Sequence, residues 1–135
     1  MASGTGPGLF GGSAQFFQGI IVGLGEAVYA RMVWDYPDKD GATLRQHVEN
    51  LKTQNLPMDL SGYPEPPEVP YGGEFVWDLF WNLRNGIGGN GFSPSPISYL
   101  ELQAYIQVTG LRLSRFMVDA VRYMDSKYME QIGKK

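Results

Sequence analysis

Few residues of this chain have the types and spacing needed for catalysis or metal binding. The 135 residues include no cysteine and one histidine, His47, so the chain offers neither a thiol nucleophile nor a cage of several histidines. Residues 38–41 (Asp-Lys-Asp-Gly) are similar to part of a calcium loop, but Tyr36 and His47 stand where that loop needs carboxylates. The sequence therefore predicts a protein that is not an enzyme and that has no metal site and no cofactor.

One glycine-rich segment carries the letters of a nucleotide-binding fingerprint. Residues 86–91 read Gly-Ile-Gly-Gly-Asn-Gly and match G-x-G-x-x-G. That fingerprint needs a strand before it and a helix that opens inside it. Here a tryptophan-bearing helix is predicted before the segment, and Phe-Ser-Pro-Ser-Pro follows it. We therefore interpret residues 85–96 as a connection between two helices.

The charge balance argues against nucleic acid as a partner. Eleven Lys and Arg against fourteen Asp and Glu give a formal net charge of −3, with no basic excess to meet phosphates. The charge is polarised along the chain, because residues 59–78 hold five acids and no base whereas residues 112–135 hold six bases and three acids. Such asymmetry is typical of solvated faces, and it can also orient a protein partner.

The start of the chain differs in composition from the rest. The first thirty residues contain eight glycines and a single charged residue, Glu26. Because each glycine weakens a helix by about 1 kcal/mol relative to alanine, we expect residues 1–41 to form a flexible glycine-rich arm and turn. The arm would become ordered on a partner, and residues 42–135 would form the compact domain. Within the arm, residues 27–34 fit either a helix or a strand.

The same region holds a stretch long enough to be tested as a membrane span. Residues 16–34 approach the roughly 20 apolar residues that a span requires. Gln18 and Glu26 lie within the stretch, and a carboxylate in the bilayer costs several kcal/mol. These two residues argue against a membrane anchor.

Capping signals and apolar periodicity predict helices in the rest of the chain. Thr43 and Ser98 each begin a capping box, and Gly110 is placed as a left-handed helix stop. Prolines between residues 57 and 70 prevent any helix from crossing that connection. No segment alternates with the period of a half-buried strand, so we predict an all-α fold of about four helices. The predicted helices span residues 43–54, 74–84, 98–109 and 114–132.

Helix 74–84 is unusually rich in aromatic residues. Phe80 belongs to its apolar core stripe, and core packing is also the favoured role for Trp77. Together the four aromatic residues Phe75, Trp77, Phe80 and Trp81 carry more apolar area than one core face needs. For Trp81 a core position and an outward position remain equally open. Aromatic side chains are enriched at protein interfaces. In the last helix, Met129 lies off the apolar stripe and is a candidate for exposed, adaptable surface.

The order and spacing of these residues resemble the tail assembly chaperones of long-tailed bacteriophages. The resemblance covers roughly residues 43–132. It is carried by Trp77-x-x-Phe80-x-x-Leu83-Arg84, Pro96-Ile97-Ser98-Tyr99-x-Glu101, Tyr105, Gly110 and Met124-Asp125-x-x-Tyr128.

The resemblance implies a non-enzymatic protein that works in the cytoplasm of the infected bacterial cell. Such a protein binds the tape measure protein, keeps it soluble and leaves as tail tube subunits polymerise around it. The tail tube protein and a second copy of the chain are further candidate partners. An alternative of another class is a structural component of the virion, such as a minor tail or connector protein. The candidate partner-binding residues are Phe75, Trp77, Trp81, Tyr99, Tyr105 and Met129.

Overall fold

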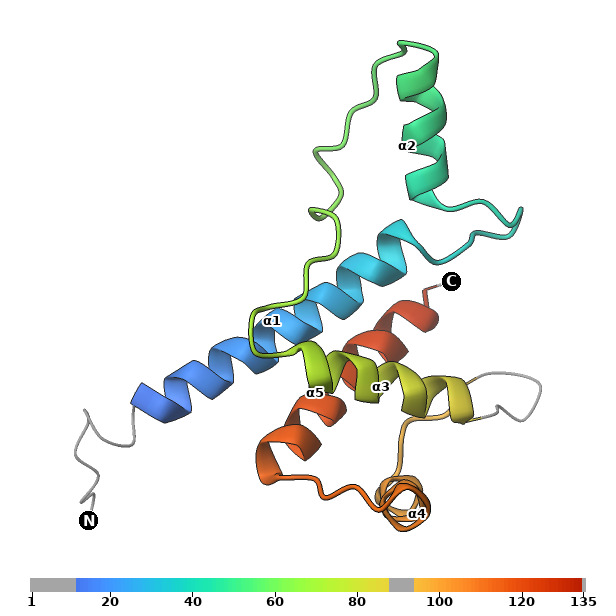
Figure 1. Ribbon diagram of the computed structural model, residues 1–135. Coiled ribbons are helices and arrows are strands. Elements are labelled where there is room, and N and C mark those ends of the chain that lie inside the picture. Colours follow the sequence, from blue (N-terminus) through green and yellow to red (C-terminus); the bar gives the residue numbers. More distant parts are fainter. Residues whose placement is uncertain (1–11, 88–93, 135) are drawn as a thin grey trace.

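The computed structural model describes residues 12–87 and 94–134, and these residues form helices and connections without a strand (Figure 1). The predicted all-α class is confirmed. The described ranges hold five helices, one more than the estimate of about four, because residues 12–34 are also helical. The helices are α1 (Gly12–Trp34), α2 (Leu44–Thr53), α3 (Glu74–Gly86), α4 (Tyr99–Thr109) and α5 (Arg115–Ile132).

Three helices, α1, α3 and α5, enclose the core. Figure 1 shows α5 running beside α1, with α3 packed on the same region. The apolar stripes predicted for α3 and α5 supply much of this core, since Phe80, Val121 and Met124 are fully buried. The largest fully buried side chains are Phe80, Leu24, Met32, Met124, Val28 and Val121.

The prediction of a flexible arm was wrong for residues 12–26, and residues 27–34 adopt the helix, one of the two alternatives that the sequence left open. Helix α1 places Ile20, Leu24, Val28 and Met32 four residues apart on one face, and all four are buried in the core. Burial of each such side chain contributes about 1.5–3 kcal/mol, which exceeds the loss of about 1 kcal/mol per glycine. Tertiary packing therefore overrides the weak helix propensity of this segment. Residues 1–11 lie outside the described residues.

Two glycines of α1 allow other segments to approach its backbone. A Cβ atom at Gly25 would lie 2.3 Å from the ring of Tyr123 in α5. A Cβ atom at Gly23 would lie 3.1 Å from the ring of Pro70 in the connection before α3. Two of the glycines that weaken α1 as an isolated helix are thus the points where α5 and the connection pack closely against it.

We predict opposite effects for substitutions at two glycines of α1. Gly25→Val should lower the free energy of unfolding by about 1–3 kcal/mol, because the new side chain overlaps Tyr123. Gly19→Ala should raise it by about 1 kcal/mol, because no neighbouring atom lies within 4 Å of the added methyl and alanine favours the helix. Chemical denaturation followed by circular dichroism measures both changes. A Gly25→Val variant as stable as the original chain would contradict the close α1–α5 packing.

The helix ends follow the predicted capping chemistry. Thr43 and Ser98 each form a complete capping box, with Gln46 and Glu101 as the reciprocal partners. Ser114 accepts a hydrogen bond from the backbone N–H of Met117 at the start of α5. Gly110 ends α4 with φ 72°, in the left-handed region predicted for it. Side-chain caps thus set the starts of three helices.

Helix α2 stands apart from the core and is tied to the end of α1 (Figure 1). The Arg45 guanidinium donates to both carboxylate oxygens of Asp35, at 2.6 and 3.2 Å, and lies 5.6 Å from the centre of the Trp34 ring. The Trp34 indole N–H donates to the carbonyl oxygen of Pro64 at 2.8 Å. The end of α1 therefore fixes both α2 and the proline-rich connection that follows it.

One helix in the described residues meets the length and composition of a membrane span. The helix is α1, and the candidate span within it is Gln15–Trp34, with a mean hydropathy of 1.2 over its most apolar window. Its apolar stripe, which includes Leu24 and Val28, is buried against the other helices. This burial is what a core helix of a bundle requires, so the segment is accounted for without a bilayer.

Candidate interaction surface

The two tryptophans predicted as binding residues pack against each other between helices. Trp77 and Trp81 are half-buried on α3, with ring centres 5.6 Å apart and an edge-to-face arrangement. The Arg31 guanidinium of α1 lies 4.0 Å from the Trp81 ring centre, and Tyr128 of α5 lies 6.0 Å from it. Such cation–π and aromatic pairs add about 0.5–1.5 kcal/mol beyond burial. Both tryptophans therefore contribute to the contact between α1, α3 and α5.

Trp81 has a further feature that distinguishes it from Trp77. Its indole N–H is buried and has no hydrogen-bond acceptor among the described residues. A buried donor without a partner costs about 1–3 kcal/mol. The ring of Trp81 is also 4.9 Å from that of fully buried Phe80. Trp81 thus lies at the edge of the core. This place is intermediate between the core position and the outward position that the sequence left open.

A buried ion pair connects α3, α5 and the segment that precedes α4. Arg84 Nη2 of α3 lies 3.0 Å from Asp125 Oδ1 of α5, and the two side chains are only 4% and 7% exposed. Arg84 Nη2 also donates to the carbonyl oxygen of Ser95 at 2.6 Å. The backbone N–H of Ile97 donates to Asp125 Oδ2 at 2.8 Å. The pair therefore fixes the segment that leads into α4.

The surroundings of Asp125 shift its titration in a defined direction. Burial raises the pKa of Asp125 above its usual range, while the hydrogen bond from Ile97 and the charge of Arg84 oppose that rise. Burial also raises the pKa of Tyr128, whose ring lies 4.6 Å from the Arg84 guanidinium carbon. Arg84, Ile97, Asp125 and Tyr128 all belong to the pattern that carries the family resemblance. In the fold, these four residues hold helices together.

The other four candidate residues do not gather at one place with the tryptophans. Phe75, in the first turn of α3, is 53% exposed. Tyr99 is exposed at the start of α4, where Arg122 of α5 lies over its ring and donates a hydrogen bond to its hydroxyl. Tyr105 is half-buried and packs against the core from α4, and Met129 is half-buried on α5. Partner binding by these residues stays a prediction.

The outward face of α4 is an apolar surface that the sequence interpretation missed. Leu102 is the only buried residue of this helix, whereas Leu100 is 76% and Val108 86% exposed. Leu100, Ala104 and Val108 are four residues apart, so they follow one another along one exposed face of the helix. We call Leu100, Ala104 and Val108 the α4 stripe. The spacing was readable in the sequence, as a second apolar stripe opposite Leu102.

The turn that is similar to a calcium loop has a structural role. Asp38 Oδ1 accepts hydrogen bonds from the backbone N–H groups of Asp40 and Ala42, at 2.9 and 3.1 Å. The N–H of Ala42 is the main reason why the pKa of Asp38 lies below its usual range. Across residues 12–87 and 94–134, no three His, Cys, Asp or Glu side chains gather to hold a metal ion. Asp38 is thus explained as a turn residue.

The glycine-rich fingerprint begins at the end of a helix. Helix α3 ends at Gly86, so a helix and not a strand precedes the G-x-G-x-x-G letters. Residues 88–93, which carry most of those letters, lie outside the described residues. Dinucleotide binding requires a strand before this motif, and α3 stands in that place.

Comparison with known proteins identifies a family for this fold. A family model described as phage tail assembly chaperone matches residues 52–130, which is more than half of the chain. The match includes α3, α4, the buried Arg84–Asp125 pair and most of α5. No curated protein and no solved structure matches the chain. The protein thus belongs to the phage tail assembly chaperone family.

Proposed function

We propose that this chaperone binds the tape measure protein through the α4 stripe and keeps it soluble until the tail tube forms. The observation that carries the proposal is the exposure of Leu100 and Val108 on a helix that buries only Leu102. Contiguous exposed apolar surface on a soluble chain marks interaction sites. Binding of a partner would remove the apolar area of the α4 stripe from water.

The geometry of α4 favours a helical client. Side chains spaced by four residues form a straight ridge along one helix, and this spacing matches the way amphipathic helices dock. Gln103 and Gln107 flank the ridge on the exposed side of α4 and supply polar groups at its margin. A long client with repeated apolar helical segments would be held at several places by several copies, without any bond being made or broken.

Coexpression with the tape measure protein tests this function. The original chain should yield a soluble complex of the two proteins, recovered by affinity purification and size exclusion. The double variant Leu100→Gln and Val108→Gln should lose that complex, because it replaces the apolar ridge with polar groups. Its melting temperature should change little, since both side chains are exposed.

A matched control uses the same helix. Gln107→Ala alters an exposed residue of α4 without removing apolar area, and it should keep the complex. An insoluble client in the presence of the original chain would contradict the chaperone function. A normal complex with the double variant would contradict the role of the α4 stripe.

A further inference from the structure

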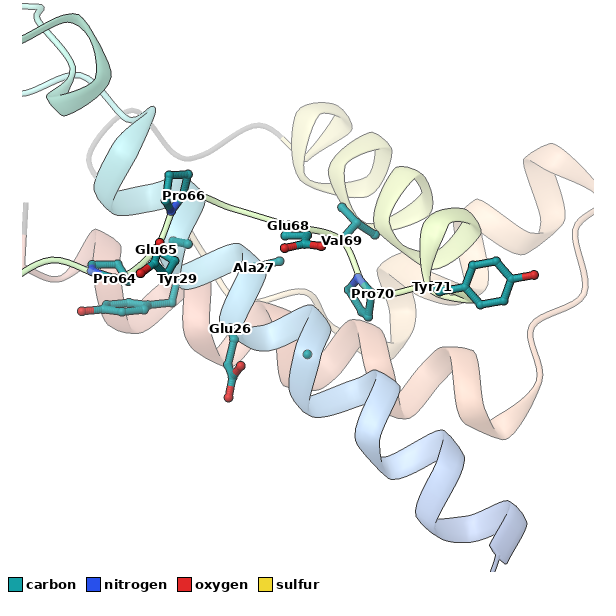
Figure 2. A pocket seen from close by; sticks show the side chains of 12 residues that line it. Glu26, Ala27, Tyr29, Pro64, Glu65, Pro66, Glu68, Val69, Pro70 and Tyr71 are labelled. Atoms are coloured by element: carbon teal, nitrogen blue, oxygen red, sulfur yellow. The ribbon is translucent and has the colours of Figure 1, made fainter. Parts of the chain in front are cut away.

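A cleft lies between α1 and the proline-rich connection that precedes α3 (Figure 2). Its volume is about 540 Å³. Gly23, Ala27 and Ala30 of α1 line it on one side, and residues 64–66 and 68–71 line it on the other. Clefts that hold small ligands measure about 300–1,000 Å³, so this one can take a short peptide segment.

The charged residues of the cleft all have the same sign. Glu26, Glu65 and Glu68 line it, and the lining contains no Lys or Arg. Figure 2 shows Glu65 and Glu68 on the connection beside α1, whereas the Glu26 side chain leaves α1 in the direction away from the connection. No cation within residues 12–87 or 94–134 forms an ion pair with these three carboxylates. The cleft is therefore complementary to a positively charged group.

The backbone of the connection also favours a positively charged group. Pro64, Pro66, Pro67 and Pro70 lack a backbone N–H, so this segment has few backbone donors. The carbonyl oxygens of Pro64 and Pro70 already accept hydrogen bonds, from the Trp34 indole and from the Gly73 N–H. The side chains of arginine and lysine have only donors. Tyr29 adds an exposed aromatic ring, whose face attracts the same cations, whereas the ring of Tyr71 extends away from the cleft. Carboxylates, an aromatic ring and a backbone poor in donors thus occur together at one cleft.

We propose that this cleft binds an arginine- or lysine-bearing segment of the client. The inference rests on the proposed function and adds a second contact to it, since the α4 stripe would take apolar residues of the client and the cleft its basic ones. Complementary charge of this kind fixes the register and raises the association rate. A client segment would then be recognised by both its apolar and its basic positions.

An array of short overlapping peptides that cover the tape measure protein tests the inference with the full chain as probe. The bound peptides should be enriched in Lys and Arg relative to the whole client. Glu65→Lys combined with Glu68→Lys should weaken binding of the basic peptides by about tenfold or more, and the remaining binding should depend less on salt. Peptides that are apolar and uncharged should bind the variant as before.

A charge-matched control separates the cleft from the overall charge. Asp40→Lys combined with Glu130→Lys changes the net charge equally at exposed positions away from the cleft, and it should keep the basic peptides bound. Captured peptides without a basic excess, or equal losses in both variants, would overturn the inference and leave the chaperone function standing. Absence of any captured peptide would overturn the function and the inference with it. Dimerisation that the cleft variant abolishes would assign the cleft to a second copy instead.

Discussion

Replacing Arg84 with methionine should lower the free energy of unfolding by about 3–5 kcal/mol near neutral pH. The substitution removes the only cation within 4.0 Å of the buried Asp125 carboxylate in the described residues. It also removes the donor to the Ser95 carbonyl oxygen. The large effect comes from the uncompensated charge, because a buried ion without a partner keeps the cost of leaving water. Chemical denaturation measures the loss.

The loss in the Arg84→Met variant should shrink in acid. The pKa of Asp125 is already raised by burial in the folded chain, and loss of Arg84 removes one of the contributions that oppose the rise. A carboxyl with a raised folded-state pKa binds its proton more tightly when folded, so stability is highest below the unfolded pKa of about 3.9 and is lost as pH rises through the folded value. The variant should therefore be closer to the original chain in acid than at neutral pH.

The double variant Arg84→Met and Asp125→Asn is the control for this interpretation. An asparagine oxygen can still accept the Ile97 N–H, and no buried charge remains. Stability should recover in large part, and the added pH dependence should disappear, because replacing both members of a buried pair is often nearly neutral. An Arg84→Met variant as stable as the original chain would show that the pair does not hold α3, α4 and α5 together.

Phe80→Ala should also destabilise the protein by about 3–5 kcal/mol. Phe80 is fully buried at the centre of the core and has aromatic contacts to Trp81 and Tyr128, at 4.9 and 6.3 Å between ring centres. Truncation leaves a cavity among α1, α3 and α5 that these rigid neighbours fill only in part. Thermal and chemical denaturation both report this loss.

The same helix supplies the comparison for Phe80. Phe75 lies five positions earlier and is 53% exposed, so Phe75→Ala should change stability by no more than about 0.5 kcal/mol. Equal losses for the two variants would contradict the assignment of the buried face of α3. If Phe75→Ala weakens client binding while stability is kept, the predicted role of Phe75 at the interface gains direct support.

Much of the fold was predictable from local chemistry. The capping boxes at Thr43 and Ser98, the left-handed stop at Gly110 and the apolar stripes of α3 and α5 depend on residues within a few positions of one another. Helix α1 was not predictable in this way. Its glycines have low helix propensity, and the compensation comes from burial of its apolar face against α3, α5 and the connection, which are distant in sequence and reach it only in the folded chain.

The functional surface was less predictable for a related physical reason. Arg84, Asp125 and Tyr128 were recognisable as family positions, but their spacing could not reveal that Arg84 meets Asp125 across 41 positions of sequence inside the core. Because aromatic residues are enriched at interfaces, Trp77 and Trp81 were predicted as binding residues, but both lie partly between helices. The more exposed candidates are the aliphatic Leu100 and Val108, since exposure depends on how α4 is placed against the bundle.

Hydrogen exchange of the complex with the tape measure protein tests the central claim most directly. The claim is that α4 holds the client by apolar contact, so the amides of Tyr99–Thr109 should exchange more slowly in the complex than in the free chain. Amides around Leu24 and Val121, already in the core, should change little. Client-induced protection that spares α4 and appears elsewhere would contradict the account.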